Sequence, residues 1–140
     1  MSKPRTATPQ SATLNIAQDQ WIEFLANFTR DYRGAHARLE VIGSDTDTGY
    51  QVETEDRPFD GVAADAKDGE HNVWITFGDT PADHITHGVH RVTAIRTLLP
   101  TSNTGPVLDI EAKDGTKTLL MLSRPEDYAL PPAAPERSRS

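Results

Sequence analysis

Residues 61–79 have the sequence GVAADAKDGEHNVWITFGD, and this stretch decides the fold. Two runs with apolar residues at alternate positions flank the dipeptide Asp68-Gly69. Alternation is typical of a half-buried β-strand, and Asp-Gly tolerates the positive φ angles of a tight hairpin turn. The stretch therefore predicts a β-hairpin.

The second arm of this hairpin carries apolar residues on both faces. Val73, Ile75 and Phe77 share one face, because side chains of a strand alternate, and Trp74 lies on the other. Both faces are therefore expected to be partly covered. Immediately before the hairpin, residues 55–58 read as a polar break that ends in proline, which favours a strand edge or a turn.

Further strands are predicted on both sides. Residues 37–41 and 50–53 alternate and form a first hairpin, whereas residues 108–112 and 118–122 flank Asp114-Gly115 as a third. Residues 91–99 are rich in Val, Thr and Ile and are typical of a strand. Because no crossover helices separate these segments, the sheet is expected to be antiparallel throughout. Residues 82–90 have no clear period and stay unassigned.

The clearest helix lies between residues 15 and 33. Its start is expected to be capped by Asn15 or by Asp19, and Gly34 suits a left-handed end. The apolar residues fall on a single helical stripe, which predicts that the helix covers one face of the sheet. They are Trp21, Phe24, Leu25, Phe28 and Tyr32.

One four-residue sequence occurs twice. Ala66-Lys67-Asp68-Gly69 is repeated as Ala112-Lys113-Asp114-Gly115, and an apolar strand follows each copy. Hairpins share turn residues for physical reasons, so an internal duplication and independent use of the same turn chemistry both account for the repeat.

These observations predict a single α+β domain over residues 14–125. An N-terminal amphipathic helix packs on an antiparallel sheet of about six to eight strands, arranged as a meander or a small barrel. Residues 1–13 and 126–140 are rich in Pro, Ser, Thr, Ala and Arg, and they are expected to be disordered tails.

The composition bears on partners and location. The formal net charge of −7 disfavours nucleic acid, because a phosphate backbone repels an acidic protein. The chain has no cysteine, so no disulfide framework is expected. It also has no apolar run of the roughly eighteen residues that span a membrane, so no membrane partner is expected. The N-terminal residues lack the apolar core of a signal peptide, and a cytoplasmic location is therefore expected.

The most suggestive chemical motif is a cluster of histidines. His84, His87 and His90 are spaced by three, and Asp79 and Asp83 lie nearby, so that imidazole and carboxylate groups suited to zinc or a related divalent ion are close in sequence. In an extended strand, however, the spacing sends successive histidines to opposite faces. Surface or hydrogen-bonded structural histidines are the alternative to a metal site.

Two other groups of residues are candidate sites. The carboxylates of residues 53–65 are explained by solvated strand faces, because spacing alone does not place an acid opposite a base. Trp21 and Trp74 are either a stacking platform for a ligand or part of helix–sheet packing. The sequence identifies no catalytic residue and no cofactor motif.

The chain carries a series of short elements in a characteristic order. They are Trp21–Leu25, Asn27–Gly34, Leu39–Gly43, Gln51–Glu53, Pro58–Val62, Asp83–His87 and Ile110–Thr118. This series, which extends over about residues 21–125, resembles a family of prokaryotic proteins catalogued as domain of unknown function number fifty-three thirty-five. The resemblance implies a bacterial or archaeal source and no assigned activity, and the family pattern includes His84, Thr86 and His87 but not His90.

Two hypotheses about function follow. The first is a non-enzymatic domain that binds another macromolecule, most simply a protein, through an exposed sheet edge or an acidic face. The second is a metal-binding or metal-dependent protein that uses His84 and His87 with Asp79 or Asp83. The sequence leaves open whether the chain is a monomer or a homodimer.

Overall fold

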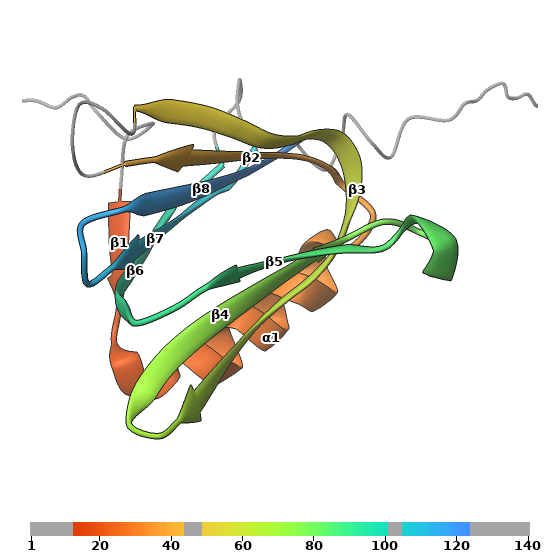
Figure 1. Ribbon diagram of the computed structural model, residues 1–140. Helices are drawn as coiled ribbons and strands as arrows, with labels where there is room; N and C mark the ends of the chain where they lie inside the picture. The colour runs from red at the N-terminus through yellow and green to blue at the C-terminus, as the bar shows by residue number, and fades with distance from the viewer. Residues whose placement is uncertain (1–12, 44–48, 101–104, 124–140) are drawn as a thin grey trace, which may run out of the picture.

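The computed structural model describes residues 13–43, 49–100 and 105–123 (Figure 1). These residues form an antiparallel sheet of eight strands with one α-helix, which confirms the α+β class. The predicted tails, residues 1–13 and 126–140, lie outside the described residues except for Thr13, which begins β1. The elements are β1 (Thr13–Ile16), η3 (Gln18–Gln20), α1 (Trp21–Tyr32), β2 (His36–Ile42), β3 (Tyr50–Lys67), β4 (Glu70–Phe77), η4 (Pro81–Asp83), β5 (Ile85–Val89), β6 (Val92–Leu98), β7 (Val107–Ala112) and β8 (Lys117–Leu122).

The sheet consists of two meanders joined side by side. Strands β2 to β5 form one meander and β6 to β8 the other, β8 pairs with β2, and β1 pairs with β6. The order β1-β6-β7-β8-β2-β3-β4-β5 leaves the sheet open, with β1 and β5 as its two ends. The predicted barrel is therefore not what the described residues form. The helix was also expected first in the chain, but it follows β1.

Strand β3 bends and serves both halves of the sheet. Its residues 50–58 pair with β2 and its residues 59–67 pair with β4. The predicted break at residues 55–58 is wrong, because irregular pairing absorbs the turn within a continuous strand: Asp56 has a φ of 61°, and the register shifts again between Phe59 and Gly61. Figure 1 shows β3 curving from the layer of β2 down to β4.

The core lies between the bent sheet and helix α1. The predicted faces of β4 are confirmed, since Val73, Ile75 and Phe77 are fully buried while Trp74 is 36% exposed. The helix contributes its predicted stripe, of which Trp21, Leu25 and Phe28 are buried. The remaining buried apolar residues are Ala35, Ala37, Leu39, Phe59, Val62, Val89, Val92, Ile95, Leu108, Ile110, Leu120 and Leu122.

The start of helix α1 differs from the prediction. Asn15 lies in β1 opposite Arg96, and the residue before the helix is Gln20, whose side chain makes no capping bond. Instead the indole Nε1 of Trp21 donates to the carbonyl of Ile16 at 2.9 Å, which ties the helix to β1. At the other end Gly34 has a φ of 95°, so the left-handed end is confirmed.

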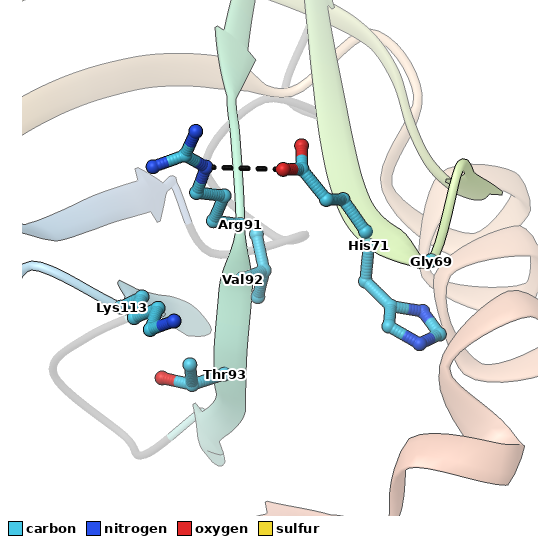
Figure 2. Close-up of a pocket in the computed structure, with 7 residues that line it drawn as sticks. Gly69, His71, Arg91, Val92, Thr93 and Lys113 are labelled. Atoms are coloured by element: carbon cyan, nitrogen blue, oxygen red, sulfur yellow. Dashed lines mark hydrogen bonds and ion pairs between the residues drawn. The ribbon is translucent and has the colours of Figure 1, made fainter.

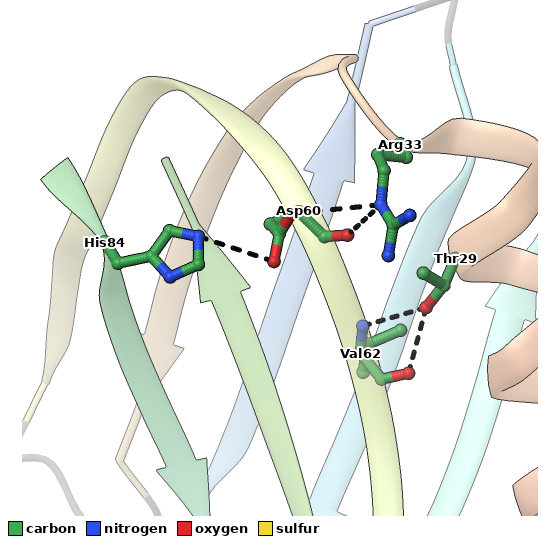
Figure 3. A network of polar contacts seen from close by, with 5 residues as sticks. All are labelled: Thr29, Arg33, Asp60, Val62 and His84. Atoms are coloured by element: carbon green, nitrogen blue, oxygen red, sulfur yellow. Dashed lines mark hydrogen bonds and ion pairs between the residues drawn. The ribbon is translucent and has the colours of Figure 1, made fainter. Parts of the chain in front are cut away.

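Helix α1 takes the place of a neighbouring strand beside the second half of β3. The hydroxyl of Thr29 accepts a hydrogen bond from Val62 N–H at 2.9 Å and donates to Val62 C=O at 3.0 Å (Figure 3). Arg33 Nε donates to Asp60 C=O at 2.8 Å. Val62 therefore directs its backbone polar groups away from β4 and toward the helix.

The two Asp-Gly turns are built differently. Asp68 and Gly69 have φ angles of 56° and 81°, which is the geometry of the predicted two-residue turn. In the second turn Gly115 alone is left-handed, and the carboxylate of Asp114 accepts the N–H of Thr116 at 2.9 Å. The repeated sequence thus does not produce a repeated structure.

Candidate functional site

Strand β5 is an open edge of the sheet. It pairs with β4 without any shift of register, and no described strand lies on its other side. Residues 82–90, which the sequence left unassigned, contain the end of η4 and the whole of β5. A strand edge of this kind presents a row of backbone donors and acceptors that a further strand can bind.

The backbone groups that face the free edge follow from the register. Val62 points its groups away from β4, so its partner Ile75 points its own toward β5 and bonds with His87. Alternate residues of a strand direct their N–H and C=O to opposite sides. Thr86 and Gly88 therefore direct these groups outward, where no described residue pairs with them.

This edge lacks several of the features that usually block pairing. Its five residues include no lysine and no proline, and its pairing with β4 contains no bulge. Ile85 is 41% exposed at one end, so an apolar side chain also borders the edge. Strand β1, at the opposite end of the sheet, has only four residues.

Trp74 covers the outer face of β5 at Gly88. These two residues lie directly opposite each other in the register, and a Cβ built on Gly88 would lie 2.5 Å from Cζ3 of the indole. The indole Nε1 donates to Asp65 Oδ2 at 2.8 Å, and the ring packs edge-on against His90 at 5.3 Å between centroids. The ring is therefore fixed over the glycine while part of it stays exposed.

A buried amide supports this arrangement. Asn72 is 8% exposed, and its Nδ2 donates to Asp65 Oδ1 at 3.2 Å. Its Oδ1 accepts the backbone N–H of Arg91 at 3.3 Å and is hydrogen-bonded with the Nδ1 of His90 at 3.3 Å. Asp65 thus receives two side-chain donors, which hold its carboxylate beside the tryptophan.

The residues predicted for a metal site are not gathered around one point. Asp83 accepts a hydrogen bond from Arg57 Nη1 at 3.1 Å, and His84 Nε2 lies 3.6 Å from Asp60 Oδ2 (Figure 3). Asp79 is exposed on the turn after β4. The described part of the chain contains no group of three or more His, Asp or Glu side chains that could hold a metal ion.

His87 lies in β5 directly opposite the buried Ile75, whereas His84 precedes this strand. Burial lowers the pKa of its imidazole, and the nearby carboxylate of Glu53 opposes that shift. A metal site of Asp79, Asp83, His84 and His87 stays a prediction, and the arrangement of these side chains gives it no support.

A hollow lies where three hairpin connections meet (Figure 2). It has a volume of about 470 Å³, and both repeated turns border it, through Gly69 and Lys113. Arg91 has a left-handed φ of 56°, and its Nε pairs with Glu70 Oε2 at 3.2 Å. The ion pair is exposed, so this hollow presents solvated charges, and no catalytic role is assigned to it.

Sequence reasoning found part of the edge site. The stacking hypothesis includes Trp74, which lies at this edge. It also includes Trp21, which is only 3% exposed and lies in the core. Gly88 was missed, because its role depends on the register that places it under Trp74.

Comparison with known proteins gives a match to a family model. The model of a family described as a family of unknown function, DUF5335, matches residues 12–132. No curated protein and no solved structure matches the chain. Within the described residues, no helix has the length and apolar character needed to cross a membrane.

Proposed function

This chain belongs to DUF5335, a family of unknown function whose model covers residues 12–132, and we propose that its domain is a protein-binding module. The partner supplies an extended segment that pairs with β5 as an additional strand. The module acts by binding, and no residue is assigned a catalytic role.

The observation that carries the proposal is the free edge at Thr86 and Gly88. Both residues direct N–H and C=O groups outward, and an incoming strand would bond with all four. Main-chain bonds of this kind supply affinity in strand addition, and pockets for alternate side chains supply specificity. The partly exposed ring of Trp74 is positioned to supply specificity, because it can contact a side chain of the added strand.

The rigidity of the neighbouring elements also favours this function. Strand β4 is held on its other side by β3, and β3 is held in turn by Thr29 of helix α1. An edge that is fixed before binding loses less conformational entropy when the partner arrives.

The test is a proline substitution that removes one outward N–H. Thr86→Pro leaves the bonds of His87 with β4 in place, because proline is tolerated at an edge where its nitrogen faces solvent. The matched control, Thr86→Val, removes only the hydroxyl and keeps the N–H. Thr86→Lys, which adds a charge that guards edges, replaces the proline variant if that variant does not fold.

Fragments of the proteins of the native host, displayed on phage, are selected against the full chain and then measured by fluorescence anisotropy. The proposal expects selected segments that bind the wild type and Thr86→Val alike and lose at least about tenfold in affinity for Thr86→Pro. Selection that yields only segments indifferent to Thr86→Pro would overturn it.

A further inference from the structure

We infer that the segment paired with β5 is basic and places a lysine or arginine opposite Gly88. This inference rests on the proposed strand addition and names the chemistry of the partner. It is carried by the distribution of charge and by the position of Trp74.

The negative charge of the protein is concentrated in the half of the sheet that ends at β5. Residues 50–90 contain nine carboxylates and only two basic side chains, Arg57 and Lys67. Residues 91–123 contain four basic side chains and three carboxylates. Uneven charge of this kind steers a partner of opposite sign and disfavours one of the same sign. The nine are Glu53, Glu55, Asp56, Asp60, Asp65, Asp68, Glu70, Asp79 and Asp83.

Two of these carboxylates lie near this end of the sheet. Asp65 lies on the outer face of β3, two strands from the edge, and its carboxylate accepts hydrogen bonds from the neutral donors of Trp74 and Asn72. Its charge is therefore not neutralised by a described cation. On the other face, Glu53 is close enough to His87 to act on its protonation. Asp65 therefore adds negative charge on the outer face of this part of the sheet, and Glu53 adds negative charge near His87 on the other face.

The register specifies which residue of the partner meets the tryptophan. Strands in a sheet lie about 4.8 Å apart, and residues directly opposite each other project to the same face. The partner residue opposite Gly88 therefore projects to the outer face, next to the indole that covers this glycine. Because Gly88 has no side chain, nothing from β5 stands between that residue and the ring.

A cation at this position gains from two neighbours. The face of an indole attracts lysine and arginine, and the attraction is strongest for tryptophan among the aromatic side chains. Asp65 lies on β3 with its carboxylate held at 2.8 Å from the indole nitrogen, so it adds a longer-range attraction for a cation that reaches the ring. It repels an acidic residue at the same position over the same distance.

A second copy of this chain is a poorer occupant. Each copy carries a formal charge of −7, so two acidic sheet halves would be brought together. The residues that β5 of a second copy would offer are Ile85, Thr86, His87, Gly88 and Val89, which include neither lysine nor arginine.

The test uses three synthetic strand peptides that differ only at the position opposite Gly88, where they carry Lys, Leu or Glu. The three peptides are variants of one selected segment whose binding is abolished by Thr86→Pro. The position in this segment that lies opposite Gly88 is identified by substituting each residue in turn. Binding to the full chain is measured by fluorescence anisotropy at low and high salt. We expect the Lys peptide to bind about tenfold more tightly than the Glu peptide, with a smaller difference at high salt.

Two variants assign the preference to its cause. Asp65→Asn keeps a hydrogen-bond acceptor for the indole and removes the charge, and Trp74→Leu removes the ring. Each is expected to reduce the preference for Lys over Glu to about threefold or less, because each removes one of the two attractions. The Leu peptide is expected to lose little on Asp65→Asn.

The outcomes separate this inference from the proposed function. Binding that depends on Thr86 but is equal for Lys, Leu and Glu overturns the basic partner and leaves strand addition standing. Absence of any binding that depends on Thr86 overturns both. A solution mass of twice 15.4 kDa that Thr86→Pro returns to one chain would show that a second copy occupies the edge, and it also overturns the basic partner.

Discussion

Removing the hydroxyl of Thr29 should destabilise the fold, because this side chain joins helix α1 to strand β3. Thr29→Val keeps the shape of the side chain, including the Cγ2 that faces Gly61, but leaves Val62 N–H and C=O without the partner that they contact at 2.9 and 3.0 Å. A hydrogen bond contributes about 1 kcal/mol to the free energy of unfolding, and a buried group left unpaired costs about 1–3 kcal/mol. Because Thr29 is half-buried, the expected loss is about 2–3 kcal/mol.

Urea denaturation followed by circular dichroism measures this loss, with the slope m expected to stay unchanged. Thr29→Ser retains the hydroxyl and is expected to keep most of the stability. Thr93→Val is the matched control, since the exposed Thr93 hydroxyl donates to Glu111 C=O at 3.3 Å and its removal should cost less than about 0.5 kcal/mol. A Thr29→Val variant as stable as Thr93→Val would refute the role assigned to the helix as a substitute strand.

Other substitutions test the turns, the edge and the titrating groups. Gly88→Ala should cost about 1–3 kcal/mol in urea denaturation, because the new Cβ overlaps Trp74, and Trp74→Leu should restore most of that loss in a double-mutant cycle. Gly69→Ala should cost about 1–2 kcal/mol, because φ is 81° there, and an unchanged midpoint would argue against the tight turn. The pKa of His87 is lowered in the folded state. As pH falls below about 6.5, the unfolded chain therefore takes up a proton that the folded chain resists, and the free energy of unfolding should fall. The free energy of unfolding of His87→Gln should fall less over that range. The pKa of Asp114 is lowered by the hydrogen bond from the N–H of Thr116. Its contribution to the free energy of unfolding is therefore present above about pH 4 and is lost as pH falls through the folded pKa. Asp114→Asn should reduce the dependence of the free energy of unfolding on pH in that range.

Local chemistry explains what the sequence predicted well. Asp68-Gly69 forms its turn because both residues accept positive φ, and the stripe from Trp21 to Tyr32 forms a helix because its period fixes one buried face. Neither depends on distant partners, so both are readable from a short window of sequence.

Distant partners explain what the sequence missed. Residues 13–16 are mostly exposed and become a strand only by pairing with β6, some eighty residues later. Residues 55–58 look like a break, but pairing with β2 keeps them in β3 while the irregular register and Pro58 accommodate the bend. Such pairings have no local signal.

The candidate site shows the same division. The spacing of His84 and His87 predicts opposite faces in an extended segment, but only His87 lies in β5, whereas His84 precedes the strand and lies near Asp60. That β5 ends the sheet could not be predicted, because it depends on the order of all eight strands. The position of Gly88 beneath Trp74 depends on the same long-range register.

Amide hydrogen exchange at β5, followed by NMR with and without a selected strand peptide, tests the central claim most directly. In the free protein, Thr86 and Gly88 should exchange quickly while His87 and Val89, which bond with β4, exchange slowly. Addition of the peptide should slow exchange at Thr86 and Gly88 and leave His87 and Val89 little changed. Slow exchange at Thr86 and Gly88 in the free protein, or no slowing on saturation with the peptide, would contradict the account.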